Sequence, residues 1–170
     1  WGVLHDGVRP FSGTIDCLTR MRSSGARIVL LSNTPDRSAT VAANLAAMGI
    51  VPALYDRLLT AGEAAWQCLR DGNDFGRRCF SPGSDFRRDE NGHPLFFAGL
   101  DLEFVDRPED ASFFLNACGG FSDEEISAQL RETQAALACG LPMVCVNPDL
   151  VVHVGERLFT CAGTFAKFYE

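Results

Sequence analysis

Two short apolar segments, each running directly into a polar loop, constrain the fold of this chain most. The first is Trp1-Gly2-Val3-Leu4, followed by His5-Asp6-Gly7, and the second is Arg27–Leu31, followed by Ser32-Asn33-Thr34-Pro35. Short runs rich in leucine and β-branched residues are typical of strands buried in a parallel sheet. Ligands of open α/β sheets bind in loops at the carboxyl ends of the strands. The pair therefore predicts a parallel sheet with a ligand site at that edge.

Helical periodicity accompanies these segments. Apolar side chains recur at helical spacing over 15–25 and again over 41–49, where we expect Thr34 to be the N-cap of the second helix. A further apolar stretch at 50–54 is expected as a strand, and a helix is expected from about 62 to 69. This βαβα order predicts a parallel sheet with right-handed crossovers.

The polar, glycine-rich stretch 71–76 reads as a boundary or long loop. After it we expect short strands at 78–81, 95–99, 102–105, 111–115 and 141–146. Ser122 and Glu125 form a capping-box pattern for a helix that Gly140 would close. The last predicted strand runs into Asn147-Pro148-Asp149. The sequence thus predicts a small α+β unit over about 77–160, inserted after the first half of a sheet.

Composition restricts the class of protein further. With 170 residues, 46% of them hydrophobic and 22% charged, the chain is expected to form one large or two small globular domains. A net charge of -7 argues against a nucleic-acid partner. We expect neither a signal peptide nor a transmembrane helix. Seven scattered cysteines without a CxxC pair indicate neither a zinc site nor a disulfide framework, which favours a cytoplasmic location.

The order of these motifs resembles a known family. GVLHDG, then LLSNTP, then the helix start TAGEAA, and finally an inserted unit that ends in a strand plus NPD are similar to the haloacid dehalogenase superfamily. Within it, they resemble the class IIA hydrolases, the nitrophenylphosphatase and pyridoxal-phosphatase-like group. The resemblance implies half of a Rossmann-like core over 1–76, a class II cap over 77–160, and the start of a return to the core over 161–170.

The family's first motif, DxDGxL, aligns its GxL part with Gly2-Val3-Leu4. Trp1 then occupies the place of the second Asp, the general acid, and the nucleophilic Asp is expected upstream of Trp1. An indole cannot donate a proton to a leaving alkoxide, which implies a loss of about 10²- to 10⁴-fold in rate. The resemblance leaves Trp1 one role, as a Mg²⁺ ligand through its backbone carbonyl.

The second motif implies that Ser32 binds the transferring phosphoryl group, with backbone N–H groups of Asn33 and Thr34 holding its oxygens. A helix N-terminus after this loop would favour an anion independently of the family. The alternative is that Ser32 or Thr34 only caps the helix.

The third and fourth motifs supply a lysine and metal-binding acids. The single lysine, Lys167, does not match the family position. The 170 residues by themselves are therefore expected to be inactive.

Two further groups of polar residues have a structural and a functional interpretation. Asn147 and Asp149 resemble the cap loop at the substrate entrance, or they form an ordinary proline turn. His5 and Asp6 are adjacent like a catalytic dyad, but a loop hydrogen bond is the expected arrangement.

The leading hypothesis is a Mg²⁺-dependent phosphatase that acts on a small phosphorylated metabolite through an aspartyl-phosphate. The competing hypothesis is a catalytically impaired binding or scaffold protein, for which Trp1 in the acid's place is the supporting feature. A homodimer is a possible assembly, by analogy with caps of this class, and no membrane partner is expected.

Overall fold

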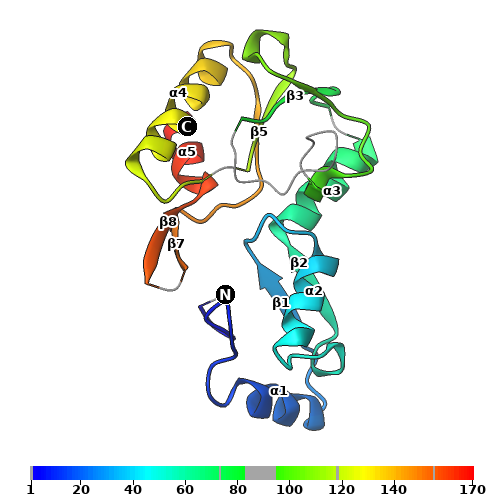
Figure 1. Ribbon diagram of the computed structural model, residues 1–170. Helices are drawn as coiled ribbons and strands as arrows, with labels where there is room; N and C mark the ends of the chain where they lie inside the picture. The colour runs from blue at the N-terminus through cyan, green and yellow to red at the C-terminus, as the bar shows by residue number, and fades with distance from the viewer. Residues whose placement is uncertain (1, 73, 83–94, 118, 155) are drawn as a thin grey trace.

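The computed structural model describes residues 2–72, 74–82, 95–117, 119–154 and 156–170, and it has two halves joined by helix α3 (Figure 1). The first half contains α1 (Thr14–Ser23), β1 (Val29–Ser32), α2 (Ser38–Ala47) and β2 (Arg57–Thr60), and α3 spans Ala61–Gly72. The second half contains β3 (Arg78–Phe80), β4 (Glu103–Val105), β5 (Phe113–Asn116), α4 (Asp123–Ala138), β6 (Met143–Cys145), β7 (Val151–Val154), β8 (Arg157–Thr160) and α5 (Ala162–Tyr169).

The first half is built on the parallel pair β1–β2, in which Ser32 lies opposite Thr60. Both strands therefore end at the same edge. One face of the pair packs against α1 and α2 in a core formed by Leu18, Ile28, Leu45, Ile50 and Tyr55. The other face is largely open, since Val29 is 56% and Leu31 is 75% exposed.

The strand expected at 50–54 is wrong. That stretch contains a 3₁₀ turn, Pro52–Leu54, and the second strand is Arg57–Thr60. Pro52 has no N–H to donate to a sheet and is well placed at the start of a tight helical turn. Ile50 is nevertheless fully buried, so its hydrophobicity reflects core packing rather than strand pairing.

No strand is present in residues 2–7, which form a tight loop with an isolated bridge between His5 and Pro10. The N–H of Gly2 donates to the carbonyl of His5, and Val3 is 79% exposed. The carboxylate of Asp6 accepts from the N–H groups of Val8 and Arg9. This confirms that His5 and Asp6 serve the loop, because His5 Nδ1 accepts from the N–H of Gly7.

The second half is built on a four-stranded sheet in the order β4-β3-β5-β6, and every neighbouring pair is parallel. Phe113 and Phe114 point to opposite faces of β5, and both are fully buried. One face packs with α3 and residues 96–97, and the other packs with Ala136 of α4 and Leu141. The strand expected at 95–99 is instead the 3₁₀ turn Leu95–Phe97.

An antiparallel hairpin of β7 and β8, which the sequence analysis missed, follows this sheet, and α5 comes after it. Helix α5 packs against α4, β5 and β6. The residues of α5 therefore contact the second half. The expected division into domains at 1–76, 77–160 and 161–170 remains a prediction.

Among the described residues, none of the helices is long and apolar enough to cross a membrane. The mixed α/β architecture with parallel sheets confirms the predicted fold class.

Candidate anion-binding site

Ser32, Asn33 and Thr34 lie where the predicted site should be, at the carboxyl end of β1. Ser32 is the last residue of the strand, and Asn33 and Thr34 begin the loop that leads to α2. Asn33 is exposed, while Ser32 and Thr34 are half-buried. The N–H of Thr34 makes a long contact of 3.5 Å with Ser32 Oγ. The loop thus presents a hydroxyl and backbone N–H groups close to solvent.

The predicted role of Thr34 as the N-cap of α2 is wrong. The helix begins at Ser38, its N-cap is Arg37, and Arg37 makes no side-chain capping bond. The N–H of Ser38 instead donates to Glu63 Oε2 from α3 at 3.3 Å. A carboxylate of this chain therefore occupies the anion position at the N-terminus of α2. The dipole of α2 therefore does not support a phosphate site at Ser32–Thr34.

The loop is held in place by the start of α3. The N–H of Gly62 donates to the carbonyl of Thr34 at 3.1 Å, and Thr60 Oγ1 donates to the carbonyl of Asp36 at 2.6 Å. A Cβ atom at Gly62 would overlap the carbonyl oxygen of Pro35, so only glycine allows this approach. The loop and the first turn of α3 therefore form one packed unit.

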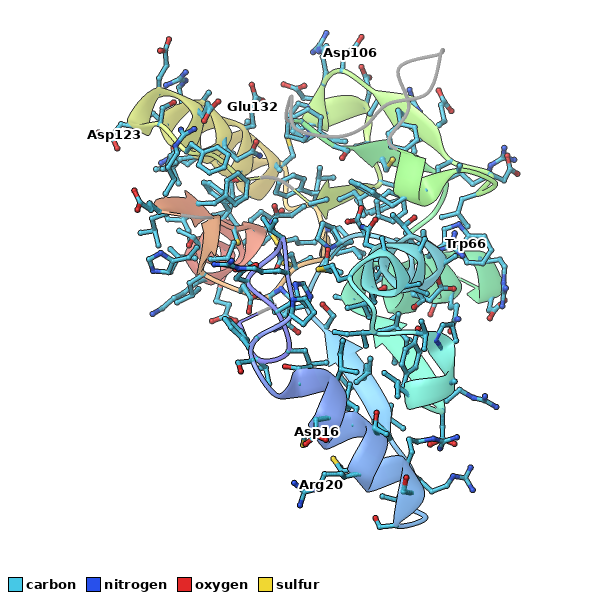
Figure 2. The ribbon with its side chains drawn as sticks, turned by 60° about the horizontal axis from the view of Figure 1, so that its bottom comes forward. Asp16, Arg20, Trp66, Asp106, Asp123 and Glu132 are labelled. Atoms are coloured by element: carbon cyan, nitrogen blue, oxygen red, sulfur yellow. The ribbon has the colours of Figure 1, made fainter. Side chains whose placement is uncertain are left out.

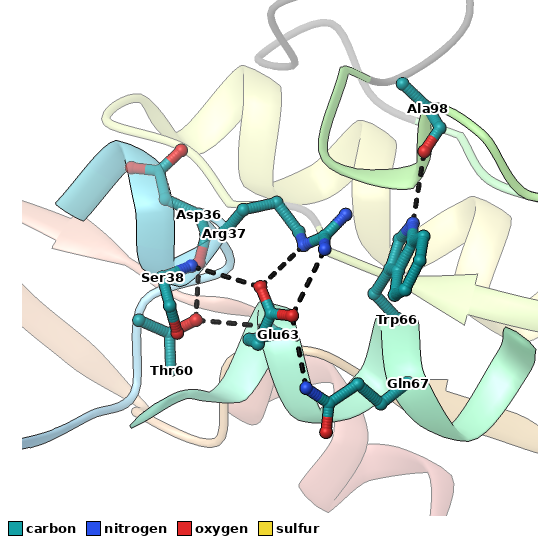
Figure 3. A network of polar contacts seen from close by, with 8 residues as sticks. All are labelled: Asp36, Arg37, Ser38, Thr60, Glu63, Trp66, Gln67 and Ala98. Atoms are coloured by element: carbon teal, nitrogen blue, oxygen red, sulfur yellow. Dashed lines mark hydrogen bonds and ion pairs between the residues drawn. The ribbon is translucent and has the colours of Figure 1, made fainter. Parts of the chain in front are cut away.

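An ionic cluster fixes the far end of the loop (Figure 3). Arg37 donates to both oxygens of Glu63, from Nε at 2.7 Å and from Nη2 at 3.1 Å. This ion pair and its hydrogen bonds hold the pKa of Glu63 below its ordinary value. The guanidinium of Arg37 also lies over the ring of Trp66, 3.9 Å from its centroid. Trp66 Nε1 donates to the carbonyl of Ala98, so the cluster connects the loop to the second half.

Asn147 and Asp149 form the loop that faces Asn33 from the second half. Asn33 Nδ2 donates to Asp149 Oδ1 at 2.8 Å, across 116 residues of sequence. The N–H of Asp149 donates to Asn147 Oδ1 at 3.0 Å, which is the turn geometry expected of an Asx residue. The structure thus brings together three of the predicted site residues, Asn33, Asn147 and Asp149, at the boundary between the halves.

The loop 147–149 rests on the first turn of α5. The N–H of Gly163 donates to the carbonyl of Asp149 at 3.0 Å, and a Cβ at Gly163 would overlap the carbonyl oxygen of Pro148. Asn116, fully buried at the end of β5, donates from Nδ2 to the carbonyl of Ala162 at 2.9 Å. The buried end of β5 therefore positions α5, and α5 positions the loop.

The thiol of Cys161 lies at the base of the same loop. Burial raises its pKa to about 11, and the negative charge of Asp149 adds to this increase. Cys161 is consequently a neutral core side chain at physiological pH and not a nucleophile.

The two loops are built alike. In each, an Asn and a Pro-Asp pair follow a parallel strand, and a glycine in the first turn of a helix packs against the carbonyl of the proline. Gly62 serves the loop at 33–36, and Gly163 serves the loop at 147–149. The site therefore lies between two rigidly supported loops.

The predicted magnesium ligand, the carbonyl of Trp1, lies outside the described residues. In the part of the chain that the structure describes, no three His, Cys, Asp or Glu side chains gather into a metal-binding group. These residues do not themselves make a magnesium site, so no chemical step through a metal is derived from them.

A groove of about 600 Å³ runs along the open face of β1 and β2. Its lining includes the apolar residues Val29, Leu31 and Leu59 and the ion pair Arg37–Glu63. Ser32, Asn33 and Thr34 are not among its lining residues. The predicted anion site is therefore an exposed loop and not this groove.

Thr60 and Glu63 were not predicted as residues that support the site, although the sequence contains their pattern. Thr60-Ala61-Gly62-Glu63 has the S/T-x-x-E form of a capping box. Thr60 Oγ1 accepts from the N–H of Glu63 at 3.0 Å, as the pattern predicts. The Glu63 side chain does not reach back to Thr60, because it is bonded to Arg37 and Ser38. The partner in α2 was not evident from the local pattern.

Comparison with known proteins gives the family. A family model described as haloacid dehalogenase-like hydrolase matches residues 1–91, more than half of the chain. None of the curated proteins compared with the chain matches it. The crystal structure of a haloacid dehalogenase-like hydrolase from Brucella suis 1330 is 34% identical and superposes with a TM-score of 0.80, over 99% of this chain and 61% of that chain.

Two more distant structures show the same fold. The glycerol phosphate phosphatase of Mycobacterium tuberculosis, in complex with magnesium, is 23% identical, with a TM-score of 0.66 over 99% of this chain and 48% of that chain. The p-nitrophenyl phosphatase of Archaeoglobus fulgidus is 18% identical, with a TM-score of 0.66 over 99% of this chain and 60% of that chain. The chain thus spans less than two thirds of the length of each of the three structures.

The parallel α/β fold, with a polar loop at the carboxyl end of β1, is that of a hydrolase of the haloacid dehalogenase type. The chain belongs to the haloacid dehalogenase-like hydrolases, which confirms the resemblance seen in its sequence.

Proposed function

We propose that the protein is a phosphatase that acts on a small phosphorylated metabolite, with Mg²⁺ as cofactor. In this proposal Ser32 donates its hydroxyl to the transferring phosphoryl group, and the N–H groups of Asn33 and Thr34 bind its oxygens. The attacking carboxylate is the Asp expected upstream of Trp1, which forms the aspartyl-phosphate. Asn147 and Asp149 belong to the loop that meets the rest of the substrate.

The observation that carries the proposal is the contact between Asn33 and Asp149. It places the loop that follows β1 directly opposite the loop that follows β6. Both loops end parallel strands, where α/β proteins bind ligands. Family membership adds a hydrolase class, and two structures of the same fold carry the names of phosphatases.

Magnesium enters by analogy, because one of those phosphatases was crystallised in complex with it. Bound magnesium would stabilise the negative charge that develops on the phosphoryl oxygens. The contribution of the described residues is separate. They orient the anion through Ser32–Thr34, and they hold that loop rigid through Gly62 and the Arg37–Glu63 pair.

The test is hydrolysis of p-nitrophenyl phosphate by the protein with its complete reading frame. We expect turnover with Mg²⁺ that stops when EDTA is added. Replacement Ser32→Ala should lower kcat/KM by about 10²-fold, the usual effect of removing one donor from a site that stabilises an oxyanion. Ser24→Ala is the matched control, since Ser24 follows α1 and its hydroxyl donates to the carbonyl of Met21, outside this loop.

The competing function, a binding or scaffold protein, rests on Trp1 and thus on a residue outside those described. No observation on the site favours it. If the complete protein binds phosphate but does not hydrolyse the ester, and if Ser32→Ala abolishes that binding, the binding function is supported and the phosphatase is refuted.

A further inference from the structure

We propose that Asp149 is a specificity-determining residue, and that it selects phosphate esters whose leaving group carries a hydrogen-bond donor or a positive charge. Esters with a second anionic group would be disfavoured. This inference rests on the proposed function, because it takes Ser32–Thr34 as the site of the phosphoryl group.

The carboxylate of Asp149 lies beside the proposed anion site. Asp149 Oδ1 accepts from the side chain of Asn33, whose own backbone N–H belongs to the proposed anion site. A phosphoryl group held by this loop would therefore lie within one residue of the carboxylate. The alcohol part of the ester extends away from the bound phosphoryl group. Where it extends toward the second half, it meets Asp149.

The carboxylate of Asp149 can accept further hydrogen bonds from a ligand. Among the described residues, only Asn33 donates to this carboxylate, and it uses one oxygen. An ionised carboxylate accepts hydrogen bonds at both oxygens and donates none. Oδ2 is therefore available for a hydroxyl or an ammonium group of a ligand, whereas a ligand carboxylate or second phosphate would meet another negative charge.

The loop that carries Asp149 is held rigidly. The backbone of Asp149 is fixed at both ends, because its N–H donates to Asn147 Oδ1 and its carbonyl accepts from Gly163. The tight contact between Gly163 and Pro148 leaves the loop no room to retreat toward α5. A ligand with a second anion therefore cannot easily move the carboxylate away.

The carboxylate also repels the phosphoryl group itself, whichever ester carries it. This penalty is shared by all ligands, so it cancels when two esters of equal size are compared. The discriminating probes are O-phosphoethanolamine and 2-phosphoglycolate, which share a two-carbon chain and differ at its end in an ammonium and a carboxylate. Inorganic phosphate serves as the probe without a leaving group.

The experiment is a calorimetric titration of the complete protein with the three probes in EDTA, so that the esters are not hydrolysed. We expect phosphoethanolamine to bind about tenfold more tightly than phosphoglycolate, the size of effect of one charge reversed across a partly exposed site. In Asp149→Asn the preference should fall to within about twofold, and inorganic phosphate should bind more tightly than before. The replacement keeps the oxygen that accepts from Asn33, so it removes charge and little else.

Asp106→Asn is the matched control, since it changes the net charge equally at an exposed position after β4 (Figure 2). It should leave the preference unchanged. Equal affinities for the two esters, or a preference that survives Asp149→Asn, would overturn the inference. If these affinities still depend on Ser32, the proposed phosphate site stands without the selectivity. If Ser32→Ala changes none of the three affinities, both proposals fall.

Discussion

The ion pair between Arg37 and Glu63 should make a measurable contribution to stability, and the replacement Glu63→Gln tests it. The carboxylate accepts from Arg37 Nε and Nη2, from the N–H of Ser38 and from Gln67 Nε2. A hydrogen bond to a charged group contributes about 1.5–3 kcal/mol. Glutamine keeps one acceptor oxygen, but it introduces an NH₂ group that faces the guanidinium.

Solvent reduces this contribution. The side chains of Arg37 and Glu63 remain 26% and 16% exposed, so water can replace part of what the substitution removes. We therefore expect Glu63→Gln to lower the free energy of unfolding by about 2 kcal/mol. With a denaturant slope of about 2 kcal/mol/M, the urea midpoint would fall by about 1 M.

The effect should also depend on pH in a defined direction. The pKa of Glu63 lies below its ordinary value of 4.5, chiefly because Arg37 donates to the carboxylate. A carboxylate whose pKa is lower in the folded state stabilises the protein above its unfolded pKa and loses that effect as the pH falls through the folded value. The difference between wild type and Glu63→Gln should thus be complete at pH 7 and should shrink below about pH 4.5.

The assay is urea denaturation followed by circular dichroism, with Glu132→Gln as the control. Glu132 is an exposed residue of α4 (Figure 2). A loss below about 0.5 kcal/mol, or one no larger than in the control, would show that the Arg37–Glu63 pair does not stabilise the fold.

Three further substitutions or modifications follow from the same structure. Gly62→Ala should destabilise the protein by about 2 kcal/mol or more, because its Cβ would overlap the carbonyl of Pro35; an unchanged melting temperature would refute that contact. Ser122→Ala should cost about 1 kcal/mol in urea denaturation, since Ser122 Oγ caps α4 in a complete capping box, and a cost near zero would argue against the box. In native protein at pH 8, iodoacetamide should label the exposed Cys17, Cys68 and Cys139 long before Cys161, whose pKa of about 11 and burial protect it. Mass spectrometry reads the order of labelling, and early modification of Cys161 would contradict its placement.

The elements that the sequence predicted correctly are those whose local signals agree with their tertiary environment. Helix α4 has its capping box at Ser122 and Glu125, and residues 113–115 of β5 are a continuous apolar run buried on both faces. The wrongly predicted strands are apolar segments whose side chains are buried in the core although their backbone does not pair in a sheet. Ile50 is a core residue next to a 3₁₀ turn, and Phe96 and Phe97 are buried in another turn of the same kind. Apolar runs this short do not distinguish the two outcomes.

The residues of the candidate site could be proposed from the sequence, but the hydrogen bonds between them could not. Ser32 ends a strand, and Asn33 and Asp149 each follow one, which the local pattern indicates. The hydrogen bond between Asn33 and Asp149 joins positions 116 residues apart, and no local pattern contains it. The same holds for Glu63, whose capping motif was readable but whose bond to the N-terminus of α2 was not. The dipole of α2 therefore does not favour an anion at Thr34, because the carboxylate of Glu63 from α3 lies at the N-terminus of α2.

A ¹H–¹⁵N NMR titration of the protein with inorganic phosphate tests the proposed anion site at Ser32–Thr34 most directly. We predict saturable shifts that are largest at the backbone amides of Asn33 and Thr34 and at the side-chain amide of Asn33, and that disappear in Ser32→Ala. Shifts confined to other parts of the chain, or a response at Asn33 that Ser32→Ala leaves intact, would contradict the claim that this loop binds a phosphoryl group.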